Sequence, residues 1–184
     1  TLVGAVVGGI PPMMGWTAAS GHLADGAWLL GAILFAWQIQ HFLALAWMYR
    51  DDYARGGYRM LPVIETSGRF TGLLAMLYSL ALIPLCAALL LIGIAGPVFA
   101  SGAAVLGVAL FLFARQLACT KTRENARRLF LASVAYLPLL MMLLVADARG
   151  PFDALQQTPN GYVRPTHDSF QDPGLAPQGA TKPQ

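Results

Sequence analysis

The sequence predicts an all-α, polytopic transmembrane helical bundle, and three observations support this class. Hydrophobic residues make up 57% of the chain. Charged residues make up only 11%, whereas a soluble domain averages about 25%. Lys, Arg, Asp and Glu are absent from four long stretches: 1–24, 26–49, 70–114 and 129–146. Because a helix needs about 20 mostly apolar residues to cross a bilayer, these stretches provide for about five crossings.

We expect five spans, at about residues 1–19, 27–49, 71–94, 97–114 and 128–146. The first span contains Pro11 and Pro12. Since proline removes an intrahelical hydrogen bond, we expect a kink or a break there. Gly4 and Gly8 of the same span form a small-xxx-small pattern, which favours close packing against another helix.

The two ends of the chain differ in character. From Asp147 onward the sequence contains six prolines, with Gly and Gln among them. Such a segment cannot bury enough apolar surface to offset its chain entropy. We therefore divide the chain into a transmembrane domain, 1–146, and a disordered Pro-rich tail, 147–184. At the other end there is no initiator Met and Thr1 opens an apolar stretch, so we expect the chain to be part of a longer protein.

The loop charges predict the orientation of the bundle. The 20–26 loop and the turn near Gly96 have no Lys or Arg, whereas the 50–69 loop has four and the 115–128 loop has five. This alternation follows the positive-inside rule. Both Arg-rich loops should therefore face the cytoplasm or the mitochondrial matrix.

Two classes of protein are disfavoured. The net charge is only +3, and no basic run is interleaved with aromatic residues, so nucleic-acid binding is not indicated. Cys86 and Cys119 are isolated in the sequence, which disfavours a zinc site or a disulfide framework.

The polar residues best suited to catalysis or ligand binding lie in segment 37–62. On a helix at about 100° per residue, four side chains share one face: Gln38, His41, Tyr49 and Asp52. Trp37 and Trp47 should point elsewhere, toward lipid or neighbouring helices. Asp51 lies about 100° from Asp52, so only Asp52 continues the face, provided that the helix extends that far.

His41 should lie well inside the membrane. It precedes Tyr49 by eight residues, a depth of roughly 12 Å at the helical rise. An intramembrane ionisable side chain is costly, and it is a candidate for function. The alternative is a neutral His bonded to a neighbouring helix. Interhelical hydrogen bonding is also the simpler explanation of Gln38 and Gln40.

Asp51 and Asp52 should lie where the helix leaves the membrane, followed by Arg55 and Arg59. Mg²⁺ is commonly held by one or two carboxylates together with substrate phosphates. Arg side chains can bind the same phosphate oxygens. A diphosphate with a lipid tail suits this position, although an ordinary charged loop explains the same residues.

Four stretches resemble the UbiA-type intramembrane prenyltransferases, over about residues 1–146. They are VGAVVGGIPPMMGW (3–16), AWQIQHFLALAW (36–47), RDDYARGGYRMLPV (50–63) and ARRLFLASVAYLPLLMMLL (126–144). The order of PPxxGW, WQxxHF and DY…P favours the haem-modifying branch, the haem O synthases, over the quinone branch.

The resemblance implies a nine-helix fold around a central cavity. It implies transfer of a farnesyl group from farnesyl diphosphate to the vinyl group of haem B, with Mg²⁺ as cofactor. The implied product is haem O, a precursor of the haem A of cytochrome oxidase. The implied location is the mitochondrial inner membrane, or alternatively a bacterial inner membrane. The first acidic motif of the family is absent from this chain, so we expect the chain to be inactive without an N-terminal half.

The resemblance also implies roles for particular residues, with the second acidic motif at residues 50–53. The implied catalytic residues are Asp52 and His41, and the implied metal ligands are Asp52 and Asp51. The implied diphosphate-binding residues are Arg50, Arg55, Arg59 and Tyr53. The implied pocket for haem or another acceptor is formed by His41, Gln38 and Tyr49. Three other functions stay open: a related transferase acting on a quinone precursor, a non-enzymatic membrane haem protein, and a transporter or structural membrane subunit.

Overall fold

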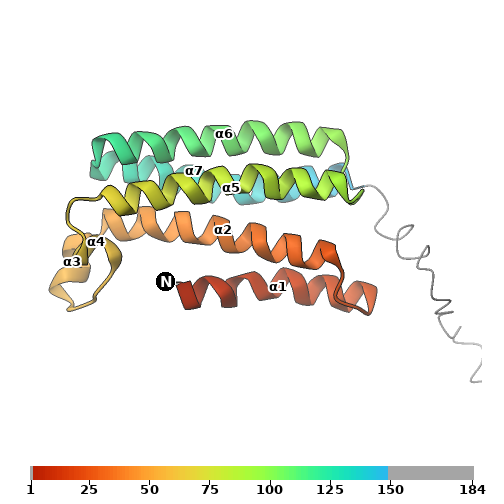
Figure 1. The fold of residues 1–184 in the computed structure, drawn as a ribbon, viewed down its shortest axis with the longest axis horizontal. Coiled ribbons are helices and arrows are strands. Elements are labelled where there is room, and N and C mark those ends of the chain that lie inside the picture. Colours follow the sequence, from red (N-terminus) through yellow and green to blue (C-terminus); the bar gives the residue numbers. More distant parts are fainter. Residues whose placement is uncertain (1, 149–184) are drawn as a thin grey trace, which may run out of the picture. The chain divides into compact units, whose positions relative to one another are not determined.

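The computed structural model describes residues 2–148, and the remainder of the predicted tail lies outside the described residues (Figure 1). The described part is all-α, as predicted, apart from one isolated bridge between Ala95 and Ala148. Its helices are α1 (Leu2–Ser20), α2 (Asp25–Met48), α3 (Arg50–Arg55), α4 (Leu61–Ile64), α5 (Arg69–Leu91), α6 (Pro97–Thr120) and α7 (Arg123–Ala146).

Four of these helices, α2, α5, α6 and α7, are long and apolar enough to span a membrane. Their mean hydropathy over 18 residues lies between 1.6 and 2.4. The prediction of a polytopic helical membrane protein is therefore confirmed. The first predicted span corresponds to α1, which is not among these four, so a fifth crossing stays a prediction.

Helix α1 runs without a break through Pro11 and Pro12. Of the kink or break expected there, the break is wrong and the kink stays a prediction. Helices α5 and α7 likewise continue through Pro84 and Pro138. In each case the lost backbone hydrogen bond is local, and the rest of a long apolar helix can still bond internally.

The turn between α6 and α7 is much shorter than the predicted 115–128 loop. Helix α6 extends to Thr120, and α7 starts at Arg123. Lys121 adopts a left-handed conformation with φ 55°. Thr122 caps α7 by accepting a hydrogen bond from the backbone N–H of Asn125 at 3.2 Å. The charges therefore mark the limit of the apolar region, whereas helical hydrogen bonding continues beyond it.

The long helices pack side by side (Figure 1). Helix α2 packs against α1, α5 and α7, and α6 packs against α5 and α7. Four helices thus form a closed ring, α2–α5–α6–α7, with α1 packed against α2. Large side chains fill the interior of this arrangement with less than 2% exposure, among them Ile33, Leu82, Leu89, Phe99, Leu110, Leu129 and Leu140.

Small residues let the helices approach closely. A methyl group at Gly9 of α1 would lie 2.9 Å from the carbonyl oxygen of Gly31 on α2. A methyl group at Gly72 of α5 would lie 2.6 Å from the Cα atom of Ala118 on α6. Gly4 has open space beside it. Close packing of α1 is therefore observed at Gly8, where a methyl group would overlap the Gln38 side chain, and at Gly9, but not at Gly4.

The two Arg-rich segments meet at one end of the bundle, as the predicted topology requires. The indole N–H of Trp47 donates to the carbonyl oxygen of Lys121 at 3.1 Å. The guanidinium of Arg123 lies 5.8 Å from the ring centre of Tyr49.

At the other end of the bundle, Asp147 joins the end of α7 to the start of α6. Its carboxylate accepts from the backbone N–H of Phe99 at 2.7 Å. Its carbonyl oxygen accepts from the N–H of Gly96 at 3.0 Å.

Candidate functional site

The predicted polar face does not continue from α2 to the acidic residues. Helix α2 ends at Met48, and Tyr49 has φ −110° and ψ 21°. A new helix, α3, then starts at Arg50. Its first bonds run from the N–H groups of Asp52 and Tyr53 to the carbonyl oxygen of Tyr49, at 3.1 and 3.0 Å. Asp52 therefore belongs to a separate short helix, and the condition for the predicted face of Gln38, His41, Tyr49 and Asp52, one continuous helix, is not met.

His41 is half-buried and lies against α7. Its Nδ1 atom is 2.7 Å from the hydroxyl oxygen of Ser133. The imidazole stacks on the Trp37 ring, with ring centres 5.0 Å apart and an interplanar angle of 20°. It also contacts the Phe130 ring at 4.6 Å and 31°. The alternative considered from the sequence, a His bonded to a neighbouring helix, is thus observed.

Trp37 belongs to the same cluster, and it points toward a neighbouring helix, α7, which is one of the two surroundings predicted for it. Its indole N–H donates to the carbonyl oxygen of Ser133 at 2.8 Å. Ser133 and Phe130 were not singled out from the sequence, although both lie in the fourth stretch that carries the resemblance. An isolated Ser within the apolar segment LFLASVAYLPLLMM was the available signal. We call Trp37, His41, Phe130 and Ser133 the histidine cluster.

The two glutamines of α2 face different surroundings. Gln38 packs against α1, where a methyl group at Gly8 would overlap its side chain. Gln38 and His41 therefore face different helices. Gln40 is fully buried, and within the described residues neither of its amide atoms has a hydrogen-bond partner. Interhelical hydrogen bonding does not explain Gln40.

The acidic residues of α3 are exposed and lie beside arginines. Asp52 forms an ion pair with Arg55, three residues later. Asp51 lies 3.4 Å from Arg50, measured from Oδ1 to Nε, and the Asp51 side chain is 88% exposed. The Arg50 guanidinium also lies 4.8 Å from the ring of Trp47. Because solvent screens such pairs, each contributes only about 0–1 kcal/mol and is easily exchanged for another partner.

The other predicted rim residues, Tyr53 and Arg59, lie in the same segment of the chain as this acidic pair. The rings of Tyr53 and Tyr58 meet edge to face at 6.1 Å. Arg59 is exposed. Gly57, with φ 73°, permits the turn that brings the chain back toward α4. Within the described residues no group of three or more His, Cys, Asp or Glu side chains gathers for a metal ion. The two carboxylates still match the one or two that Mg²⁺ usually takes when phosphates complete its coordination.

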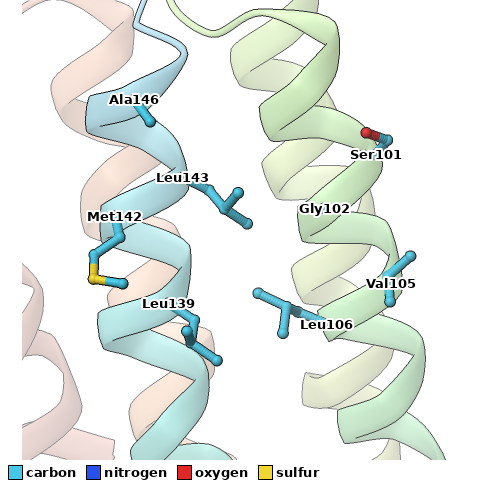
Figure 2. A pocket seen from close by; sticks show the side chains of 8 residues that line it. All are labelled: Ser101, Gly102, Val105, Leu106, Leu139, Met142, Leu143 and Ala146. Atoms are coloured by element: carbon cyan, nitrogen blue, oxygen red, sulfur yellow. The ribbon is translucent and has the colours of Figure 1, made fainter.

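Two grooves in the described part of the chain lie away from the predicted site residues. One groove of about 590 Å³ lies between α6 and α7. Its lining is mostly apolar, with Leu106, Leu139, Met142 and Leu143 around Gly102 (Figure 2). A second groove, of about 470 Å³, is lined by residues of α1 and Leu23. Neither groove contains His41, Asp51 or Asp52.

These features define a class of protein: an integral membrane bundle with an intramembrane histidine cluster and an acidic, Arg-rich segment at one end. The match to known proteins agrees with this class. Residues 1–143 match the model of the UbiA prenyltransferase family, and the chain belongs to that family.

Curated relatives identify the branch of the family that this chain resembles. It is 45% identical over 154 residues to a protoheme IX farnesyltransferase of Koribacter versatilis, covering 80% of this chain and 50% of the relative. It is 43% identical over 149 residues to the mitochondrial protoheme IX farnesyltransferase of Homo sapiens, covering 81% of this chain and 33% of the relative. The chain thus spans about half the length of the bacterial relatives it matches, and less of the human one. No solved structure matches it.

Proposed function

We propose that this chain forms part of a protohaem IX farnesyltransferase, which transfers a farnesyl group from farnesyl diphosphate to a vinyl group of haem B and yields haem O. The observation that supports this most strongly is 41–45% identity, over about 80% of the chain, to relatives with that name. The arrangement of an intramembrane histidine and an acidic rim agrees with a substrate that has an apolar tail and a charged head.

The rim would hold the diphosphate. Asp51 and Asp52 would supply carboxylates to Mg²⁺, whose positive charge would help to neutralise the leaving diphosphate. Arg55 would exchange its weak pair with Asp52 for the phosphate oxygens, and Arg50 and Arg59 would add further donors. Tyr53 would contribute a hydroxyl beside them. As the bond between farnesyl C1 and the diphosphate oxygen breaks, these groups stabilise the developing negative charge.

The histidine cluster would face the acceptor. The electron pair of the haem vinyl group forms the new carbon–carbon bond to farnesyl C1. Water then adds to the resulting cation and loses a proton, which completes the hydroxyethylfarnesyl group. Aromatic side chains such as Trp37 and Phe130 exclude bulk water from this region, and a dry site protects the allylic carbon from hydrolysis. Gln38 faces α1 and Tyr49 lies beside Arg123, so any contact of these two residues with the acceptor would be made outside the histidine cluster.

The proposed activity needs more than these residues. The chain spans about half of its bacterial relatives, and the family's first acidic motif is not found in it. We therefore propose that an N-terminal half completes the pocket and that the chain alone is inactive. Its relatives include bacterial and mitochondrial enzymes, so the proposed location is the inner membrane of a mitochondrion or of a bacterium.

A comparison of acceptors tests the proposal. A full-length protein that contains this chain is incubated with farnesyl diphosphate, Mg²⁺ and either haem B or 4-hydroxybenzoate. We expect haem O from haem B and no prenylated benzoate. Prenylation of 4-hydroxybenzoate alone would place the protein in the quinone branch. A stable haem spectrum without any transfer would identify a haem-binding protein instead.

A further inference from the structure

We propose that Ser133 fixes the tautomer of His41, so that Nδ1 carries the ring proton and Nε2 keeps a free electron pair. Ser133 is then a positioning residue for His41. The proposal depends on the direction of two hydrogen bonds that share the Ser133 hydroxyl.

The direction of these bonds follows from counting protons. The Ser133 hydroxyl has one hydrogen, and its oxygen lies 2.6 Å from the carbonyl oxygen of Phe130. A carbonyl oxygen can only accept, so the hydrogen bond between these two oxygens uses the hydroxyl hydrogen. The same hydroxyl oxygen lies 2.7 Å from Nδ1 of His41. With its hydrogen already used, the oxygen can only accept there, and Nδ1 must be the donor.

The surroundings hold this arrangement in place. Ser133 is fully buried, so bulk water does not compete for its hydroxyl. Trp37 donates to the Ser133 carbonyl oxygen at 2.8 Å and stacks on the imidazole 5.0 Å away. Phe130 contributes both the terminal carbonyl acceptor and a ring at 4.6 Å from that of His41. A rotation of the imidazole about its Cβ–Cγ bond would lose the hydrogen bond and the stacking together.

The consequence concerns Nε2. In neutral His, a hydrogen bond made by one ring N–H leaves the other nitrogen as an acceptor or metal ligand. His41 is only half-buried, so Nε2 can address a partner that lies beyond the described residues. If the proposed function is correct, that partner is the haem substrate. Nε2 would then either bind its iron or accept the proton that is released after water adds to the vinyl carbon.

The tautomer can be measured directly. The protein is labelled with ¹⁵N-histidine, reconstituted in lipid nanodiscs at a pH where His is neutral, and examined by NMR. The ¹⁵N shifts distinguish a protonated from an unprotonated ring nitrogen, and His41→Gln assigns the signals by their loss. We expect a protonated Nδ1 and an unprotonated Nε2. The Ser133→Ala variant should shift the population toward Nε2–H, and Ser133→Thr, which keeps the hydroxyl, should restore the original pattern.

Matched controls separate tautomer control from general disruption. Trp37→Phe keeps a stacked ring and leaves the Ser133 hydroxyl in place, so the tautomer should persist. The His22 signal should be the same in all variants. A wild-type His41 protonated at Nε2, or a Ser133→Ala variant with an unchanged tautomer, would overturn the proposal. Since this readout does not involve farnesyl transfer, failure of the proposed activity with the expected tautomer would contradict only the proposed function.

Discussion

Gly96 and Asp147 should be energetically coupled, because the structure leaves no room for a side chain between them. A methyl group at Gly96 would overlap the Asp147 carboxylate, with its Cγ atom only 2.6 Å away. Gly96 has φ −89° and ψ −179°, a conformation that Ala adopts freely. The cost of Gly96→Ala is therefore steric, and it should fall sharply once the carboxylate is removed.

The magnitudes follow from the contacts that are lost. Asp147→Ala removes the carboxylate that accepts from the Phe99 N–H at 2.7 Å, and loss of such an N-terminal cap costs about 0.5–2 kcal/mol. Gly96→Ala must displace the same carboxylate, so by itself it should cost a similar amount or more. Residues in direct contact typically show coupling of about 0.5–3 kcal/mol. We expect the double variant to lose clearly less free energy of unfolding than the two single variants lose when their losses are added.

Reversible unfolding of the purified protein in mixed detergent micelles, followed by tryptophan fluorescence, measures this coupling. Gly15→Ala is the matched control, because its methyl group meets open space. Since Gly15 lies inside α1, this change should raise the free energy of unfolding by about 0.5–1 kcal/mol, and it should show no coupling with Asp147→Ala. Additive effects of Gly96→Ala and Asp147→Ala would refute the proposed contact between the start of α6 and the end of α7.

Two further predictions concern stability. Gln40 is buried without a partner among the described residues, and burying such an amide costs about 1–3 kcal/mol. In the same assay, Gln40→Leu should therefore raise the free energy of unfolding and Gln40→Glu should lower it. A destabilising Gln40→Leu would show that the amide is hydrogen-bonded. The hydroxyl of Ser67, and with it the Phe70 N–H at 3.3 Å, lowers the pKa of Glu65. Because the pKa of Glu65 is lower in the folded state, its stabilisation of the fold is present above about pH 4.5 and is lost as the pH falls through the folded pKa. The free energy of unfolding should therefore change less between pH 5 and pH 3 in Glu65→Gln than in the wild type. An identical pH profile of the two proteins would contradict this assignment.

The membrane class and the approximate helices were predictable, because they depend on where charges are absent. Helix ends were less predictable. Arg115 falls inside α6, since a helix continues after its apolar face has ended. The pairing of the Arg-rich segments at one end was also predictable, and contacts of Trp47 and Tyr49 with Lys121 and Arg123 agree with it.

The site was predicted less completely, for two physical reasons. The helical wheel assumed one continuous helix, whereas the backbone at Tyr49 departs from helical geometry and separates His41 from Asp52. A wheel also describes only one helix at a time. The partner of His41 is Ser133, which lies 92 residues away in the sequence, and nothing within segment 37–62 indicates it. The roles of Asp51, Asp52 and their neighbouring arginines stay predictions.

The measurement that tests the account most directly is haem O formation by a full-length protein that contains this chain, with Asp52→Asn compared against Asp51→Asn. Asp52 is the carboxylate paired with Arg55, while Asp51 is 88% exposed. We expect near-complete loss of turnover for Asp52→Asn and partial retention for Asp51→Asn, with both variants inserted normally in the membrane. Near-normal haem O production by the Asp52→Asn variant would contradict this expectation.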